Sequence, residues 1–83
     1  MERNSIFEKV EKYVLKNINM DQIGNDVNIF EDGLVSSLFA IELMTFLEKN
    51  FDIKITTDDL DMENYRSINN IVEFICKKNA DNT

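Results

Sequence analysis

The chain has 83 residues and a formal net charge of −7, with 43% hydrophobic and 30% charged residues. A chain of this length is expected to form one domain, 1–83, that buries only about 60% of its unfolded surface, too little for a deep catalytic cavity. The balance of apolar and charged residues supports a small packed core rather than a disordered tail. An autonomous enzyme is therefore not expected.

The negative charge is concentrated in one part of the chain. Residues 31–63 contain nine acidic side chains and two lysines, whereas the remainder contains seven of each sign. This distribution argues against nucleic-acid binding and favours basic protein partners. The same acids would also serve as a plain solvated surface that aids solubility.

Cys76 is the single cysteine, and the chain contains no histidine. One cysteine cannot form an internal disulfide, so a cytoplasmic location is expected, with Cys76 as a small apolar residue rather than a redox thiol. Without histidine there is no Ser–His nucleophile pair and no histidine metal site. The N-terminus lacks a signal-peptide pattern, and no stretch has the roughly 20 apolar residues of a membrane span.

A first helix is predicted over residues 5–18. Ser5 and Glu8 have the spacing of a capping box, and apolar residues then recur at helical spacing. The periodicity stops between Asn19 and Ser36, yet apolar residues still occur there. We therefore expect a long ordered loop, anchored to the core by Ile23, Val27, Ile29, Phe30 and Leu34.

Three further helices are predicted after this loop. The second covers residues 37–50 and has more apolar positions than one buried stripe requires, so part of its surface should meet a partner. Thr56 is expected to cap a short third helix over 57–63, and Ser67 a fourth over 67–78, with fraying from Ala80 onward. The predicted fold is all-α, a four-helix bundle with a long loop between helices 1 and 2 and a short third helix. The predicted core consists of Leu34, Leu38, Leu43, Leu47, Phe51, Ile55, Ile68, Ile71, Val72 and Ile75.

Ser37 follows the loop that contains Gly33 and begins the second predicted helix. A helix N-terminus presents unpaired backbone N–H groups and the positive end of the helix dipole. A phosphate ester on a hydroxyl at this position would therefore be stabilised. Ser37 is accordingly the candidate for covalent modification.

The run from Phe30 to Leu38, the apolar helix after it and the turn Phe51-Asp52-Ile53 resemble the attachment region of the acyl carrier and peptidyl carrier proteins. In that family the serine aligned with Ser37 carries a 4'-phosphopantetheine arm, whose thiol holds an acyl group as a thioester. The resemblance covers nearly the whole chain. It implies a monomeric carrier with no catalytic residue and no metal. The implied partners are a phosphopantetheinyl transferase, an acyl-loading enzyme and a downstream synthase or acyltransferase.

Ser36 stands where most carriers have an aspartate, which leaves two adjacent hydroxyls as candidates for modification. Alignment through Leu38, Glu42 and Leu43 favours Ser37. Ser36 would then be either a plain helix N-cap or a changed contact with the transferase. The partner-binding face is expected on Ser36, Leu38, Phe39, Ile41, Glu42, Thr45 and Glu48, although core packing is the alternative for each apolar member.

Two segments resemble one branch of the family more closely. The run from Gly33 to Ala40 and the segment from Asp58 to Ser67 are similar to stand-alone carriers that deliver hydroxymalonyl or methoxymalonyl extender units to polyketide synthases. D-alanyl carriers of teichoic acid modification are also similar around the third helix, but match less well at Phe39-Ala40. We therefore expect a discrete carrier for a specialised acyl unit.

Two other classes of protein stay open at this point. One is a helical adaptor that binds its partner without any cofactor. The other is a calcium-binding protein, because Asp59, Asp61 and Glu63 alternate as in a calcium loop. That segment lacks the central glycine and the distant bidentate glutamate of such loops, which weakens the calcium hypothesis.

Overall fold

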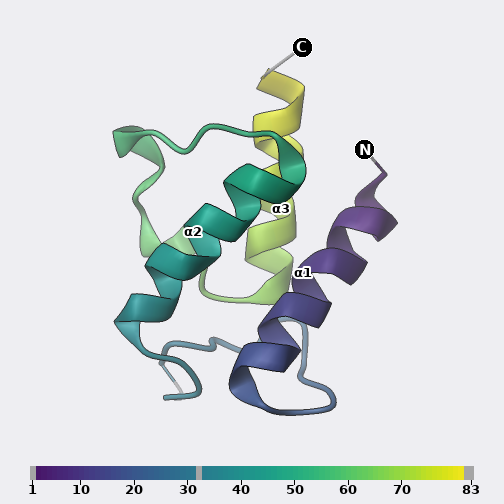
Figure 1. The fold of residues 1–83 in the computed structure, drawn as a ribbon, viewed down its shortest axis with the longest axis vertical. Helices are drawn as coiled ribbons and strands as arrows, with labels where there is room; N and C mark the ends of the chain where they lie inside the picture. Colours follow the sequence, from purple (N-terminus) through teal and green to yellow (C-terminus); the bar gives the residue numbers. More distant parts are fainter. Residues whose placement is uncertain (1, 32, 82–83) are drawn as a thin grey trace.

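The computed structural model describes residues 2–31 and 33–81, which contain three α-helices and two 3-10 turns. In chain order the elements are α1 (Arg3–Ile18), α2 (Ser37–Phe51), η1 (Thr57–Asp59), η2 (Met62–Asn64) and α3 (Ile68–Asp81). In the view of Figure 1, α2 crosses in front of α3, and the long loop between α1 and α2 lies at the lower end of the molecule. The all-α prediction is confirmed, since the described residues contain no strand.

The predicted third helix over 57–63 is wrong as a single α-helix. Asp59 accepts a hydrogen bond from the backbone N–H of Thr56 at 2.8 Å, which closes η1 at its predicted cap. Asp61 then accepts one from the N–H of Glu63 at 3.0 Å, which opens η2 as a separate turn. η1 is capped by Thr56, which pairs with Asp59, and η2 has its own cap at Asp61. The segment therefore forms two separate 3-10 turns where the third α-helix was expected.

The start of α1 also differs from the prediction. The N–H of Ile6 donates to the carbonyl of Glu2 at 3.1 Å, so the helix already begins at Arg3. Ser5 therefore lies within the helix, and its predicted capping box does not mark the N-terminus. α1 ends where Asn19 adopts the left-handed conformation with φ 58°, which asparagine tolerates better than most residues.

The cap of the last helix is confirmed. The Ser67 hydroxyl accepts a hydrogen bond from the N–H of Asn70 at 3.2 Å, and α3 begins at the next residue, Ile68. The helix continues to Asp81, three residues beyond the predicted end, so fraying from Ala80 is not seen in the described backbone. Residues 82–83, which were also expected to fray, lie outside the described residues.

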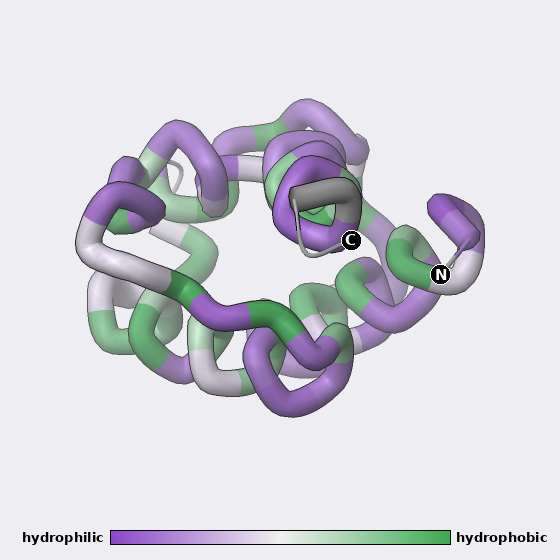
Figure 2. The backbone as a smooth tube through the Cα atoms, turned by 90° about the horizontal axis from the view of Figure 1, so that it is seen from above, coloured by the Kyte–Doolittle hydropathy of each residue, from purple (hydrophilic) through white to green (hydrophobic). Residues whose placement is uncertain are grey.

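One cluster of buried apolar side chains joins the three helices and the segments between them. Figure 2 shows hydrophilic and hydrophobic segments alternating along the helices, as expected for helices that bury one face in a core. Most of the predicted core is confirmed as buried, and Leu34 and Ile55 are half-buried against the cluster. The buried set is Ile6, Val10, Val14, Ile29, Phe39, Leu43, Leu47, Phe51, Ile53, Tyr65, Ile68, Ile71, Val72, Phe74 and Ile75.

Leu38 is the exception among the predicted core residues, because its side chain is 62% exposed. It lies in the first turn of α2, where the buried positions are Phe39 and Ala40. The helix is therefore rotated relative to the prediction at this end. Among the helices that the structure describes, none has the length and apolar character needed to cross a membrane.

Candidate functional site

Ser37 is the first residue of α2 and is exposed. Ser36 precedes it in an extended conformation, at φ −90° and ψ 170°, and occupies the N-cap position. The Ser36 carbonyl accepts the N–H of Phe39 at 3.0 Å, but the Ser36 side chain makes no capping hydrogen bond. Ser36 thus has the position of the predicted N-cap without its side-chain interaction.

The loop before α2 turns sharply at Gly33. This glycine has φ +72°, a value that other residues rarely adopt, and its N–H donates to the carbonyl of Phe30 at 3.3 Å. Just upstream, the Asn28 side chain accepts the N–H groups of Phe30 and Glu31 at 3.0 and 2.9 Å. These two turns direct the chain into α2 and so determine where Ser37 emerges.

The same loop is fastened to the start of α3. The N–H of Ile29 donates to the carbonyl of Arg66 at 2.8 Å, and the N–H of Asn69 donates to the carbonyl of Asn25 at 3.0 Å. A third bond joins the side chains of Asn69 and Asp26 at 2.6 Å. The prediction of an ordered loop anchored to the core is confirmed for four of the five expected anchors: Ile29 is buried, and Ile23, Phe30 and Leu34 pack against the core cluster, whereas Val27 does not belong to it.

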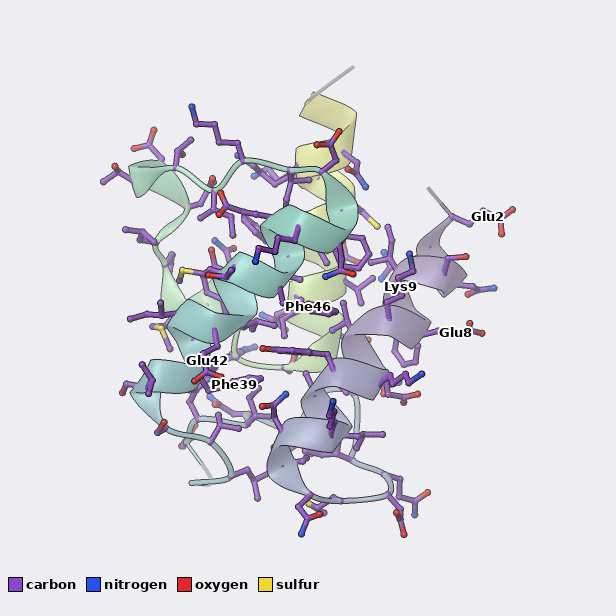
Figure 3. All side chains as sticks on the ribbon, viewed as in Figure 1. Glu2, Glu8, Lys9, Phe39, Glu42 and Phe46 are labelled. Atoms are coloured by element: carbon purple, nitrogen blue, oxygen red, sulfur yellow. The ribbon has the colours of Figure 1, made fainter. Side chains whose placement is uncertain are left out.

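Phe39 was expected on the partner-binding face, and the structure contradicts this. Its side chain is buried, with its ring stacked on Tyr13 at a centroid distance of 5.7 Å and tilted against Phe30 at 6.3 Å. Tyr13 also stacks on Phe46, whose centroid lies 3.9 Å away. Figure 3 shows Phe39 and Phe46 on the side of α2 that faces α1. The Phe39 side chain is buried because Tyr13 of α1 and Phe30 of the loop pack against its ring.

The remaining predicted face of α2 does lie outward. Ile41 is 62% exposed, as is Leu38, and the side chains of Glu42 and Thr45 are exposed as well. The Thr45 hydroxyl donates to the carbonyl of Ile41 at 3.2 Å and so stays close to the helix. The pKa of the Tyr13 phenol is raised, first by burial and then by the nearby negative charge of Glu42.

Glu48 is exposed but already engaged within the protein. One of its carboxylate oxygens accepts the backbone N–H of Ile55 at 2.9 Å. This bond holds the segment after α2 against the last turns of the helix. Glu48 therefore has a structural contact that its assignment to the partner face did not anticipate.

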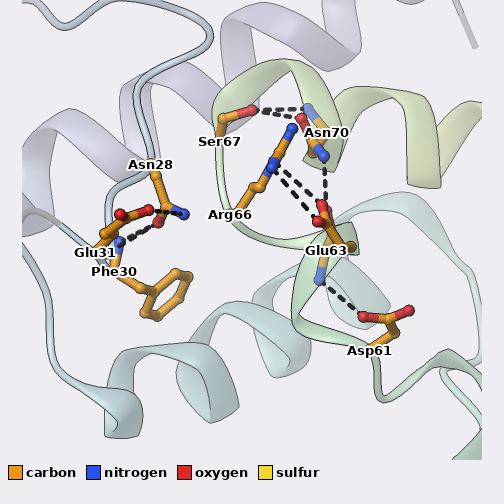
Figure 4. Close-up of polar contacts among 8 residues, drawn as sticks. All are labelled: Asn28, Phe30, Glu31, Asp61, Glu63, Arg66, Ser67 and Asn70. Carbon is orange, nitrogen blue, oxygen red and sulfur yellow. Dashed lines mark hydrogen bonds and ion pairs between the residues drawn. The ribbon is translucent and has the colours of Figure 1, made fainter.

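The three carboxylates that suggested a calcium loop each make a different contact within the protein. Asp59 contacts Lys78 at 2.7 Å. Figure 4 shows the other two: Asp61 caps η2, and Glu63 pairs with Arg66 at 3.2 Å. No cluster of three potential metal ligands occurs among the described residues. The structure thus explains these acids through their contacts with the protein itself.

Tyr65 is a structurally prominent residue that sequence reasoning did not single out. Its side chain is fully buried, its hydroxyl donates to the carbonyl of Asp59 at 2.8 Å, and its ring meets Phe74 edge-on at 5.3 Å. Burial, and then the charges of Asp59, Asp61 and Glu48, raise its pKa to about 12. The only sequence signal for its burial was its position as an aromatic residue two positions before Ser67, the cap of α3.

The Ser37 position suits a phosphate ester. The serine begins a helix of 15 residues, and the first turn of that helix contains no acidic side chain. Helix N–H groups in the first turn lack intrahelical partners and can donate to phosphate oxygens. A phosphodiester on the Ser37 hydroxyl would therefore meet the positive end of a dipole and no carboxylate from the same turn.

Comparison with known proteins agrees with this geometry. Residues 8–75 match the family described as phosphopantetheine attachment site. The acyl carrier protein of Buchnera aphidicola subsp. Schizaphis graminum is 31% identical over 78 residues, which cover 92% of this chain and 96% of that protein. The acyl carrier protein of Thermotoga maritima is 30% identical over 78 residues, covering 92% and 94%. The D-alanyl carrier protein of Lactococcus lactis subsp. cremoris is 33% identical over 57 residues, covering 69% and 72%.

A small helical fold with an exposed serine at a helix start is the arrangement of a carrier protein. The chain belongs to the phosphopantetheine attachment-site family, the family of the acyl carrier proteins. Its cofactor is a covalently bound 4'-phosphopantetheine, and it acts as a carrier. Carriers of this family interact with a phosphopantetheinyl transferase and with acyl-handling enzymes.

Proposed function

We propose that Ser37 carries the 4'-phosphopantetheine arm and that the protein, as a monomeric single domain, holds a specialised acyl unit for polyketide synthesis. The favoured unit is a glycerate-derived hydroxymalonyl or methoxymalonyl group. The observation that supports the site is the exposed Ser37 hydroxyl at the start of α2, with no acid in the first turn. The resemblance from Gly33 to Ala40 supports the type of cargo.

Attachment of the arm requires only an accessible hydroxyl from the carrier. The Ser37 oxygen forms a bond to the phosphorus next to the pantetheine of coenzyme A, the bond to adenosine 3',5'-bisphosphate breaks, and the serine proton leaves. When bound, the arm supplies the thiol on which the acyl group is held as a thioester. The residues of this chain orient the hydroxyl, stabilise the phosphodiester and present a surface to each enzyme.

The proposed partner face consists of four outward-facing residues of α2, with Ser36 at its edge. Leu38 and Ile41 supply exposed apolar surface, and Glu42 and Thr45 supply polar surface beside it. Exposed apolar side chains next to polar ones suit the centre of a protein interface. The proposed partners are the transferase, the acyl-loading enzyme and the downstream synthase or acyltransferase.

A D-alanyl carrier is the second candidate function. The groove between the loop and η2 is lined by three acidic residues, Glu31, Asp61 and Glu63, and one basic residue, Arg66. Such a surface would attract the ammonium group of an aminoacyl unit more than the carboxylate of a hydroxymalonyl unit. A D-alanine-activating enzyme and a glycerate-loading enzyme would distinguish the two candidates when each is supplied with the phosphopantetheinylated protein.

Mass spectrometry of the intact protein tests the attachment site. The protein is incubated with coenzyme A and a broad-specificity phosphopantetheinyl transferase, followed by peptide mapping of residues 33–48. We expect one added arm on Ser37, none in Ser37→Ala, and one arm that is still added on Ser37 in Ser36→Ala, at whatever rate the changed edge of the partner face allows. Modification of Ser37→Ala together with loss in Ser36→Ala would assign the arm to Ser36. A folded protein that gains no arm at all would make the cofactor-free adaptor the leading alternative.

A further inference from the structure

Tyr13 of α1 is held between two aromatic rings of α2. Its ring stacks on Phe39 at a centroid distance of 5.7 Å and on Phe46 at 3.9 Å, with interplanar angles of 21° and 16°. Phe39 and Phe46 lie two helical turns apart, about 10.5 Å along the helix axis. The Tyr13 ring therefore lies between them, and contacts on both of its faces fix its position against α2.

This arrangement leaves the Tyr13 hydroxyl at the surface. The residue is half-buried, and its side chain takes part in no hydrogen bond within the part of the chain that the structure describes, whereas its backbone carbonyl accepts the Asn17 amide at 2.8 Å. The described residues contain no buried polar side-chain atom without a partner, so the phenol oxygen is in contact with water. A phenylalanine ring would fill the same stack, which leaves the hydroxyl available for a contact outside the protein.

Glu42 lies on the same stripe of α2 as the two rings. Residues 39, 42 and 46 are spaced i, i+3 and i+7, so they share one side of the helix. Glu42 is exposed, and none of the ion pairs among the described residues involves it. Burial, and then the negative charge of Glu42, raise the pKa of the Tyr13 phenol, so the phenol is neutral at physiological pH. A neutral hydroxyl and a carboxylate without an ion-pair partner thus meet at the border between α1 and α2.

Glu42 joins this border to the proposed partner face. Leu38, Ile41 and Thr45 form the neighbouring stripe of α2, and the side chains of Leu38 and Ile41 are each 62% exposed. Glu42 follows Ile41 directly and lies five residues after Ser37, about 7.5 Å along the helix axis. An enzyme that acts on the Ser37 hydroxyl and covers Ile41 therefore also reaches Glu42 and the phenol beside it.

The groups at this border suit a cationic side chain. The Glu42 carboxylate and the Tyr13 phenol oxygen both accept hydrogen bonds, and a lysine or an arginine supplies several donors together with a positive charge. The nine acidic residues and two lysines of residues 31–63 give the surrounding field the sign that attracts such a group. The exposed apolar side chains next to it suit the centre of an interface. The complementary surface is therefore a basic side chain beside an apolar patch.

We propose that Tyr13 completes the docking face for the phosphopantetheinyl transferase, and that its hydroxyl and the Glu42 carboxylate together bind one lysine or arginine side chain of that enzyme. The inference rests on the proposed function, namely an arm on Ser37. It adds a residue of α1 to a face otherwise formed by α2, and it states the charge of the group that docks there. Tyr13 acts in docking rather than at the reacting phosphate.

The test measures the kinetics of arm addition on the full chain. The carrier is titrated against coenzyme A and a broad-specificity phosphopantetheinyl transferase, and the modified protein is quantified by mass spectrometry. In Tyr13→Phe and in Glu42→Gln, we expect KM for the carrier to rise about 2- to 10-fold, as for the loss of one hydrogen bond, with kcat unchanged. The double variant should barely exceed the larger single effect, because both groups bind the same side chain.

Matched controls separate docking from folding and from net charge. Ser5→Ala removes another exposed hydroxyl from α1, and Glu8→Gln removes a charge from a carboxylate that points away from α2 in Figure 3. Both should leave KM unchanged. Tyr13→Phe should melt at the same temperature as the unsubstituted protein, because the stacked ring is retained. The effect of Glu42→Gln should disappear as the salt concentration approaches about 1 M, where the Debye length is about 3 Å.

Three outcomes would overturn the inference: an unchanged KM in Tyr13→Phe, additive effects in the double variant, or a loss that appears in kcat instead of KM. An equal rise in KM for Glu8→Gln and Glu42→Gln would also contradict it, since the transferase would then respond only to net charge. An unsubstituted protein that gains no arm would instead contradict the proposed attachment function.

Discussion

The ammonium of Lys78 lies 2.7 Å from the carboxylate of Asp59, and the two side chains are only 17% and 16% exposed. This contact joins η1 to the far end of α3, across 19 residues of sequence. The same carboxylate accepts the N–H of Thr56, so one group holds both the start of the turn and the end of the helix. Two short turns with little regular structure of their own thereby gain a fixed position.

Replacing Lys78 by methionine should lower the free energy of unfolding by about 2 kcal/mol, because a largely buried carboxylate loses its charged hydrogen-bond partner. Urea denaturation followed by circular dichroism measures the change. Lys77→Met is the matched control, since Lys77 is the exposed neighbour on the same helix. Equal denaturation midpoints for the two variants would contradict a stabilising role for the ion pair.

The stability should fall at acidic pH in a way that depends on Asp59. The hydrogen bond from Lys78, followed by that from the Thr56 N–H, lowers the pKa of the Asp59 carboxyl in the folded protein. This stabilisation is fully present above the unfolded pKa of about 3.9 and is lost as the pH falls through the lower folded pKa. The difference in unfolding free energy between the unsubstituted protein and Asp59→Asn should stay constant from about pH 7 to 5 and shrink below about 4. A constant difference down to strong acid would show that Asp59 is not the titrating group.

Phe39→Ala should destabilise the fold by about 3–5 kcal/mol, because it removes a buried ring stacked on Tyr13. Ile41→Ala, two residues on in the same helix, removes an exposed side chain and should change stability by less than about 0.5 kcal/mol. Thermal or urea unfolding of both variants tests the rotation of α2. The reverse order of effects would mean that Phe39 faces outward, as the sequence had suggested.

Glu48→Ala should lower the unfolding free energy by about 1 kcal/mol, since the Ile55 N–H loses its acceptor. Glu48→Gln retains a side-chain oxygen and should recover most of the loss. Urea unfolding of the two variants separates the hydrogen bond from the charge. If Glu48→Gln is as unstable as Glu48→Ala, the contribution of Glu48 is electrostatic rather than a hydrogen bond to Ile55.

The elements that sequence patterns predicted best are those whose signals are local. The helical spacing of Ile6, Val10 and Val14 indicated α1, and the Ser67 cap indicated the start of α3. The exposed position of Ser37 at the beginning of α2 follows from the loop and the apolar helix that flank it. These features depend on residues a few positions apart, so a periodicity or a capping motif can reveal them.

The features that were missed depend on partners far away in sequence. Phe39 is buried because Tyr13 and Phe30 stack on it, and nothing in the α2 sequence alone shows which of its many apolar positions will find such partners. The separate cap at Asp61 divides the segment of the predicted third helix into two turns. The burial of Tyr65 depends on its hydrogen bond to the Asp59 carbonyl and on its ring contact with Phe74 of α3, and the sequence patterns predicted neither contact.

The bonds from Ile29 to Arg66 and from Asn69 to Asn25 have a consequence for enzymes that would act at Ser37, the proposed attachment site. The loop loses its conformational freedom when the domain folds, not when a partner arrives. Docking on this preorganised loop avoids the entropy cost of ordering it, so affinity can come from few contacts and still permit rapid release. A carrier that must visit several enzymes in turn benefits from contacts that are specific in shape but brief in duration.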